Sequence, residues 1–160
     1  MKEIYIHHHL GLGDHIDMNG LIRFYINAKG YKKVYLFVKS SYHDMIKYMY
    51  SDEERIELIK IDPKLDEDAQ VFNYIEKNNC KEFLRIGFEK YPHGREFIDN
   101  KNCWEYFYEQ VKIPFNIKTE LFYIERNTEE ENRLFNKLNP NNQTFAFVHD
   151  DPNRGFILNE

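Results

Sequence analysis

The residues best placed to do chemistry are Gly11, Gly13 and Asp14, within the segment His9-Leu10-Gly11-Leu12-Gly13-Asp14-His15-Ile16. A carboxylate held in a loop of this kind can accept a proton from a sugar hydroxyl during group transfer. The two glycines would let a substrate approach the backbone. The alternative is structural, because an aspartate at the start of a helix caps its free N–H groups. Spacing alone leaves both interpretations open. The helix N-terminus would also lower the pKa of Asp14 and weaken it as a base unless burial compensates.

Two other uses of a glycine loop are disfavoured. A dinucleotide-binding fingerprint needs a third glycine where this chain has Ile16, and an acidic residue after the second strand where it has Lys39-Ser40-Ser41. A phosphate cradle conflicts with Asp14, whose carboxylate would repel an anion at the helix N-terminus. No lysine follows to complete a P-loop. We therefore expect no nicotinamide cofactor and no P-loop nucleotide.

The elements around this loop predict an α/β fold. Residues 4–8 are rich in β-formers, and the helix after Asp14 repeats apolar residues at Met18, Leu21, Ile22, Tyr25 and Ile26. Further strands are predicted at residues 32–39, 57–62 and 82–88, with helices at 42–50 and 66–79, the latter with Ala69, Phe72 and Ile75 inward. This alternation predicts a doubly wound, mostly parallel sheet flanked by helices, in a Rossmann-like fold. The glycine loop would lie at its carboxyl edge, where such sheets bind ligands.

The second half of the chain is less regular. Residues 91–95 form a loop by their Pro and Gly, at the same edge of the sheet, and its Arg95 would suit an anionic acceptor or a diphosphate. We predict a helix at residues 102–111, an extended piece at 121–124 and a helix at 128–138. Residues 1–138 then form one domain, 139–143 a polar linker, and 144–160 either the start of a second domain or the last strand of the first.

Composition narrows the class of protein. The net charge of −5 gives no reason to expect nucleic acid, which needs a basic footprint. The two cysteines have no metal-binding spacing, and alternation along a strand lets at most His7 and His9 of the three successive histidines share a face, so we expect no metal. No apolar run approaches the roughly 20 residues that cross a bilayer. We expect no transmembrane segment, no signal peptide and a cytoplasmic protein.

The segment from His9 to Ile16, followed by Asn19-Gly20-Leu21-Ile22-Arg23, resembles the start of GT-B glycosyltransferases of the heptosyltransferase-like type. Those enzymes begin with a strand, a Gly-Asp turn and a helix, and they use the aspartate of the turn as catalytic base. The resemblance implies that Asp14 is that base, in an inverting, metal-independent transfer from a nucleotide-sugar, which is the co-substrate in place of a cofactor. The predicted substrate-binding residues are Gly11, Gly13, His9, His15, Asn19 and Arg95, with the two histidines as hydrogen-bond donors.

GT-B enzymes have two Rossmann-like domains, and the donor nucleotide binds mainly to the second. The resemblance therefore implies that residues 1–138 are the acceptor-side domain, binding a carbohydrate or glycolipid acceptor. It also implies that a C-terminal donor domain or subunit is missing, and that this chain is inactive alone. The alternative function is a non-catalytic Rossmann-like binding or scaffolding domain, which keeps the loop only as a helix cap.

Overall fold

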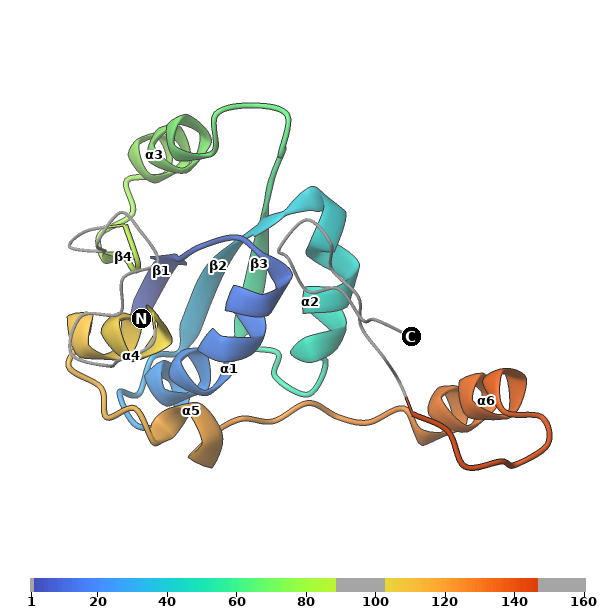
Figure 1. Cartoon of the computed structure of the whole chain (residues 1–160). Coiled ribbons are helices and arrows are strands. Elements are labelled where there is room, and N and C mark those ends of the chain that lie inside the picture. Colours follow the sequence, from blue (N-terminus) through green and yellow to red (C-terminus); the bar gives the residue numbers. More distant parts are fainter. Residues whose placement is uncertain (1, 89–102, 147–160) are drawn as a thin grey trace. The chain divides into compact units, whose positions relative to one another are not determined.

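The computed structural model describes residues 2–88 and 103–146 of the chain (Figure 1). The chain divides into two compact units, residues 1–125 and residues 126–160. The described sheet and the helices between residues 12 and 120 belong to the first unit, and the helix at residues 128–138 belongs to the second. Within the described residues, no helix is long and apolar enough to cross a membrane.

The first unit is built on a four-stranded sheet in which every described pairing is parallel. Its strands are β1 (Glu3–His7), β2 (Lys33–Lys39), β3 (Ile56–Ile61) and β4 (Phe83–Arg85), in the spatial order β3-β2-β1-β4. Tyr5 of β1 is in register with Tyr35 of β2 on one side and with Phe83 of β4 on the other. The predicted α/β class with a parallel sheet flanked by helices is confirmed, and the strand order is consistent with a Rossmann-like fold.

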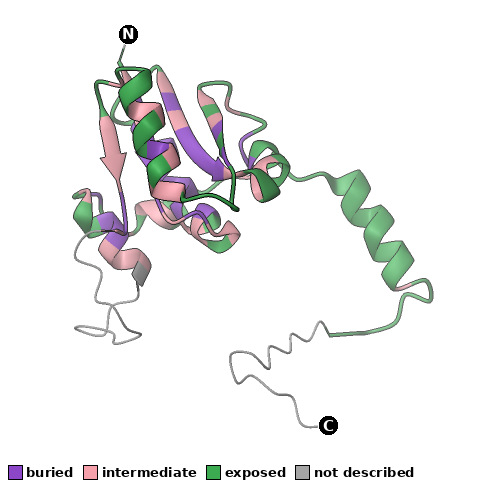
Figure 2. Ribbon diagram, turned by 90° about the horizontal axis from the view of Figure 1, so that it is seen from above, coloured by how far each residue is buried: buried purple, intermediate pink, exposed green. Residues whose placement is uncertain are grey.

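Helices cover both faces of this sheet. The described helices of the first unit are α1 (Leu12–Asn27), the 3₁₀ turn η1 (Ser40–Tyr42), α2 (His43–Met49), α3 (Glu67–Lys77), α4 (Cys103–Gln110) and α5 (Ile117–Glu120). One core joins α1, α2 and α4 to Ile4, Ile6 and Leu36 of the sheet, and a second joins α3 to Phe37 and Ile61. The strands are accordingly buried between helices that are exposed on their outer sides (Figure 2).

The inward faces of two helices test the predicted periodicity. All five apolar positions predicted for α1 are buried, from Met18 to Ile26. The predicted inward face of α3 is wrong in two of three positions: Ala69 and Phe72 are exposed, while Val71 is fully buried and Ile75 packs beside it. The helix is rotated relative to the prediction because Val71, rather than a larger residue, fits against Phe37 and Ile61 of the sheet.

The end of strand β4 and the presence of helix α5 differ from the predictions. Strand β4 ends at Arg85 rather than Phe88, because Gly87 has a left-handed φ of 89° and turns the chain out of the sheet. The short helix α5 was not predicted, since four residues are too few to show a helical period. The segment that follows, residues 121–124, has no strand.

The second unit contains α6 (Thr128–Leu138), a helix with the predicted bounds. Its N-cap is Asn127, whose side chain accepts a hydrogen bond of 3.0 Å from the backbone N–H of Glu130. Of residues 144–160, predicted as the start of a second domain or the last strand of the first, residues 144–146 have no regular structure and the others lie outside the described residues. The assignment of residues 144–160 to a donor domain stays a prediction.

Candidate functional site at the carboxyl edge of the sheet

The glycine loop lies where the order of the strands reverses. Strand β1 is followed by helix α1 and β2 on one side, whereas its other neighbour is β4. In open parallel sheets this reversal leaves a crevice beyond the carboxyl ends of the two strands, and ligands bind there. The loop after β1 and the turn after β4 meet at this edge, where the His9 ring Nε2 lies 3.1 Å from the carbonyl oxygen of Gly87.

Asp14 is the third residue of α1, and Gly11 is the N-cap. The Asp14 carboxylate accepts a hydrogen bond from the backbone N–H of Gly11. An acidic residue at the third position that reaches back to the N-cap N–H forms half of a capping box. The other half is missing, because glycine has no side chain to bond the third N–H. A structural role for Asp14 therefore has direct support in this geometry.

The ionisation of Asp14 is nevertheless governed by burial. Burial of the carboxyl group raises its pKa above the ordinary value of 3.8, and Asp17 acts in the same direction. His9, the Gly11 N–H and Lys39 lower the pKa, but by less. The result is a half-buried carboxylate whose pKa moves toward the neutral range where a general base works best.

His9 is held by aromatic neighbours as well as by Gly87. Its ring centroid lies 5.1 Å from that of Phe88 and 5.2 Å from that of Phe107, both edge-on. A Cβ atom on Gly87 would lie 2.8 Å from the Phe107 ring and 3.2 Å from the His9 ring, so only glycine fits there. The N–H of Gly87 donates to the Gln110 side-chain oxygen at 2.9 Å. His9 is therefore held in a fixed position between the two loops, close enough to lower the pKa of Asp14.

His15 lies in the core. It is fully buried, and its ring packs edge-on against His8 with centroids 4.4 Å apart. Its predicted contact with a substrate stays a prediction, and the buried position favours a packing role.

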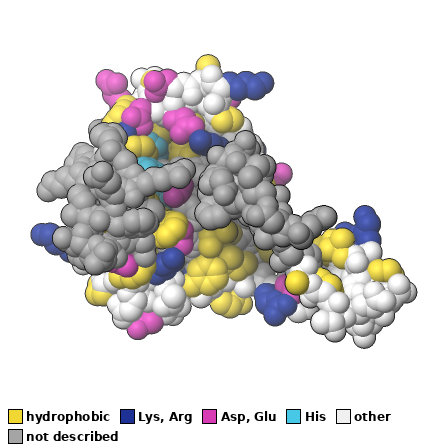
Figure 3. Space-filling model, in the orientation of Figure 1, with side chains coloured by type: hydrophobic (Ala, Val, Ile, Leu, Met, Phe, Trp, Pro, Cys, Tyr) yellow, Lys and Arg dark blue, Asp and Glu magenta, His cyan; other side chains and the backbone are white. Residues whose placement is uncertain are grey.

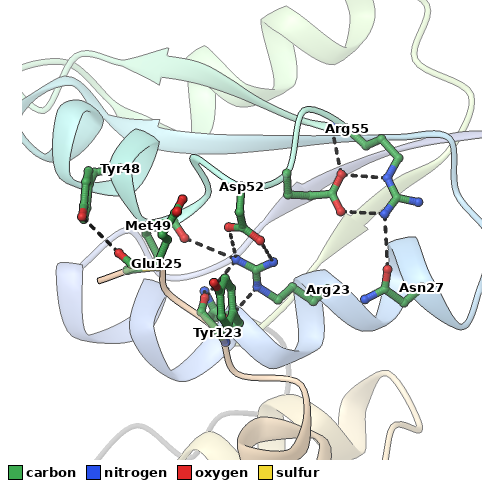
Figure 4. Close-up of polar contacts among 10 residues, drawn as sticks. Arg23, Asn27, Tyr48, Met49, Asp52, Arg55, Tyr123 and Glu125 are labelled. Atoms are coloured by element: carbon green, nitrogen blue, oxygen red, sulfur yellow. Dashed lines mark hydrogen bonds and ion pairs between the residues drawn. The ribbon is translucent and has the colours of Figure 1, made fainter. Parts of the chain in front are cut away.

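Arg23 donates a hydrogen bond to Asn19, and both residues of α1 bond to Tyr123 in the segment after α5. Figure 4 shows Arg23 between Asp52 and Tyr123. The buried Asn19 amide donates to the carbonyl oxygen of Tyr123 at 3.2 Å and accepts from its N–H at 3.0 Å. Arg23 binds both carboxylate oxygens of Asp52 at 2.8 Å and also donates to the Tyr123 carbonyl at 2.9 Å. Asn19 thus anchors a chain segment in this structure, and its predicted contact with substrate stays a prediction.

Two glycines of α1 differ in their surroundings. Gly20 allows α5 to lie close to α1, because a Cβ atom there would lie 2.9 Å from the Lys118 carbonyl oxygen and still closer to that of Ile117. A glycine inside a helix can also allow the helix to lie close to a sheet, but here the close neighbour of Gly20 is α5. Gly13, by contrast, is exposed with nothing near its missing Cβ.

Arg95, which the sequence predicts at this edge of the sheet, lies outside the described residues. Arg85, at the end of β4, places a guanidinium group at this edge that was not predicted from the sequence. It pairs with Asp68 at 2.5 Å, and its Cζ lies 4.0 Å from the centre of the Phe88 ring. Gly87 was missed too, although a glycine inside a predicted strand signals a turn or a close approach.

No metal site is found among residues 2–88 and 103–146, where no three potential ligands converge. Acidic and histidine side chains do lie next to one another on the face shown in Figure 3. A hollow of about 610 Å³ lies elsewhere, along α2 and the start of β3, lined by residues such as Lys47, Tyr48 and Ile56. It shares no residue with the carboxyl-edge site, which rests on the positions of Asp14 and His9 rather than on cavity size.

Comparison with known proteins found no match: no family model, no curated protein and no solved structure is similar to this chain.

Proposed function

We propose that the chain is the acceptor-binding part of a GT-B-like glycosyltransferase in which Asp14 is the general base. The transfer is a one-step, inverting displacement without a metal ion. The acceptor hydroxyl oxygen forms a bond to the anomeric carbon while the bond from that carbon to the nucleotide breaks. Asp14 takes the proton of the hydroxyl group.

The observation that carries this proposal is the position of Asp14. Its carboxylate lies at the reversal of strand order, next to His9, with a pKa that burial raises. A carboxylate that serves only as a cap gains from full ionisation at a helix N-terminus, so a raised pKa is unfavourable for capping and favourable for proton transfer. Gly11 and His9 line the approach to this carboxylate, and a second domain supplies the nucleotide-sugar.

A second function has its own observation. The hydrogen bond from the Gly11 N–H to the Asp14 carboxylate is the interaction that a purely structural helix start requires. In that case the chain is a non-catalytic Rossmann-like binding or scaffolding domain.

Calorimetric titration separates the two. The complete native protein is titrated with a panel of nucleoside-diphosphate sugars, alongside the Asp14→Asn and Asp44→Asn variants. Asp44 provides a matched control because its carboxylate lies in the first turn of another helix, α2. A transferase binds one of these sugars with the same Kd in all three proteins, and only Asp14→Asn loses transfer. A scaffolding domain binds none of them.

A further inference from the structure

Three histidines form a buried layer beneath the candidate site. His7 ends strand β1, His8 follows it, and His15 lies one turn into α1; each is fully buried. Five of their six ring nitrogens have no hydrogen-bond partner among the described residues, and the sixth, Nδ1 of His8, lies 2.5 Å from the carbonyl oxygen of His9. Since an imidazolium must donate two hydrogen bonds, such surroundings accept only the neutral ring.

Buried histidine rings that lack hydrogen-bond partners lie on both sides of the sheet. His8 and His15 stack edge-on on the α1 side, at 4.4 Å between ring centroids. His7 points to the other side, between Phe37 and Phe88, with centroid separations of 6.0 Å and 4.5 Å. The three rings thus surround the start of the loop that leads to Asp14.

Within residues 2–88 and 103–146, no unpaired carboxylate acts on these rings. The charged groups that act on His7 are Asp68 of α3, Arg85 of β4 and His9 of the loop, and Asp68 is already bound by Arg85 at 2.5 Å. Burial and the rings of His15, His7 and His9 all disfavour a proton on His8, and only the backbone carbonyl of His9 favours one. Burial alone governs His15.

We propose that this histidine layer is an acid-sensitive device: the fold that positions Asp14 exists only while His7, His8 and His15 are neutral, and their joint protonation opens it. The inference does not depend on glycosyl transfer, since it concerns the folded state of the first unit.

The direction of the effect follows from linkage. Burial lowers the pKa of His7 and of His15 from 6.5 to about 4, and that of His8 falls well below 6.5. A histidine whose pKa is lowered by folding leaves stability complete above pH 6.5 and removes it as the pH falls from 6.5 toward the folded pKa. Three such groups release up to three protons on folding. The unfolding equilibrium constant should therefore rise by up to about a thousandfold per pH unit of acidification in this window.

Carboxylates act in a different range. Asp52 and Glu53 have pKa values lowered from 3.8 and 4.5 by Arg23 and Arg55, so their contribution is lost only below about pH 4.5. Asp14, whose pKa burial raises, acts in the opposite direction, because its protonation in the folded state stabilises the fold as the pH falls. A net loss of stability between pH 6.5 and 5 therefore reports the histidines.

The test is urea unfolding of the full chain at several pH values from 8 to 5, which yields the proton uptake on unfolding. Near pH 5 we expect the native sequence to take up between two and three protons on unfolding, and the His15→Gln and His7→Phe variants one fewer, with uptake falling to none above pH 6.5. The control is His43→Gln, because His43 is only partly buried and its ring Nδ1 lies 2.9 Å from the fully exposed carboxylate of Asp44. Its proton uptake should equal that of the native sequence. Uptake of one proton or fewer in the native sequence would overturn the proposal.

A second measurement needs no variant. The nitrogen chemical shifts of the imidazole rings report the protonation state of each histidine in the folded protein. The proposal requires the rings of His7, His8 and His15 to stay neutral at pH 6 for as long as the chain is folded. Any of the three gaining its proton near pH 6 without unfolding contradicts it.

Discussion

Gly11 and Asp14 occupy adjoining space: a Cβ atom on Gly11 would lie 2.7 Å from Oδ2 of Asp14. The loop glycine and the candidate base therefore depend on each other, since any larger residue at position 11 displaces the carboxylate from its hydrogen bond.

The first prediction compares two glycines of this loop. In Gly11→Ala the flexible carboxylate should move and lose its bond to the N-cap N–H, at a cost of up to ~1 kcal/mol in the free energy of unfolding. In Gly13→Ala nothing is displaced, because no atom lies within 4 Å of the missing Cβ. That variant should gain about 0.5–1 kcal/mol because alanine suits a helix better than glycine. Urea unfolding at pH 8 measures both, and equal effects would contradict this geometry.

The second prediction concerns the pH dependence that Asp14 itself contributes. A carboxyl group whose pKa is raised by folding supports the folded state below its ordinary pKa of 3.8, and this contribution is lost as the pH rises through the folded value. At neutral pH the ionised group is therefore a cost that Asp14→Asn removes, while the amide oxygen keeps the hydrogen bond. We expect the variant to unfold at a urea concentration equal to or above that of the native protein. A loss of more than ~1 kcal/mol would instead favour the capping function.

The third prediction addresses the anchor of the segment after α5. Arg23 is 7% exposed and Asp52 is 24% exposed, so Arg23→Met leaves a partly buried carboxylate without its partner. We expect a loss of ~3 kcal/mol in the free energy of unfolding. Lys33→Met is the control, since the two side chains of its pair with Glu57 are 36% and 51% exposed. It should cost less than ~1 kcal/mol, and similar losses in the two variants would refute the role assigned to Arg23.

A fourth prediction concerns the contact of α1 with α5. Gly20→Ala inserts a methyl group against the backbone carbonyl oxygens of Ile117 and Lys118, which cannot rotate away as a side chain can. We expect a loss of about 1–3 kcal/mol, despite the better helix propensity of alanine. Thermal unfolding monitored by circular dichroism measures it. A stabilised variant would show that the two helices are not in close contact.

The parts of the fold that were predicted correctly are those where buried apolar residues repeat with a clear period. Ile4 and Ile6 mark β1, and Met18 to Ile26 mark the inner face of α1, because one face of each packs on the core. The parts that were missed depend on contacts between distant segments. Nothing near Gly87 in the sequence shows that Phe107 fills the space beside it, and nothing near Asn19 shows that Tyr123 binds its amide.

The candidate site was likewise predictable where local sequence determines it and unpredictable where distant segments meet. The position of Asp14 at a helix start beyond β1 was predictable from the glycines and the strand before it. The balance of its ionisation was not, because burial and the charges of His9 and Lys39 come from the folded arrangement. The burial of His15 was also unpredicted, since its position one turn into the helix is compatible with either the core or the site.

The central claim is tested most directly by turnover of the complete native protein with a nucleotide-sugar that it binds and a carbohydrate acceptor. The initial rate of glycosyl transfer is compared for the native protein, Asp14→Asn and the control Asp44→Asn. General-base catalysis predicts that Asp14→Asn lowers kcat by about 10²–10⁴-fold with unchanged nucleotide-sugar affinity, while the control keeps the native rate. Transfer by Asp14→Asn at the native rate would contradict the assignment of Asp14 as the base.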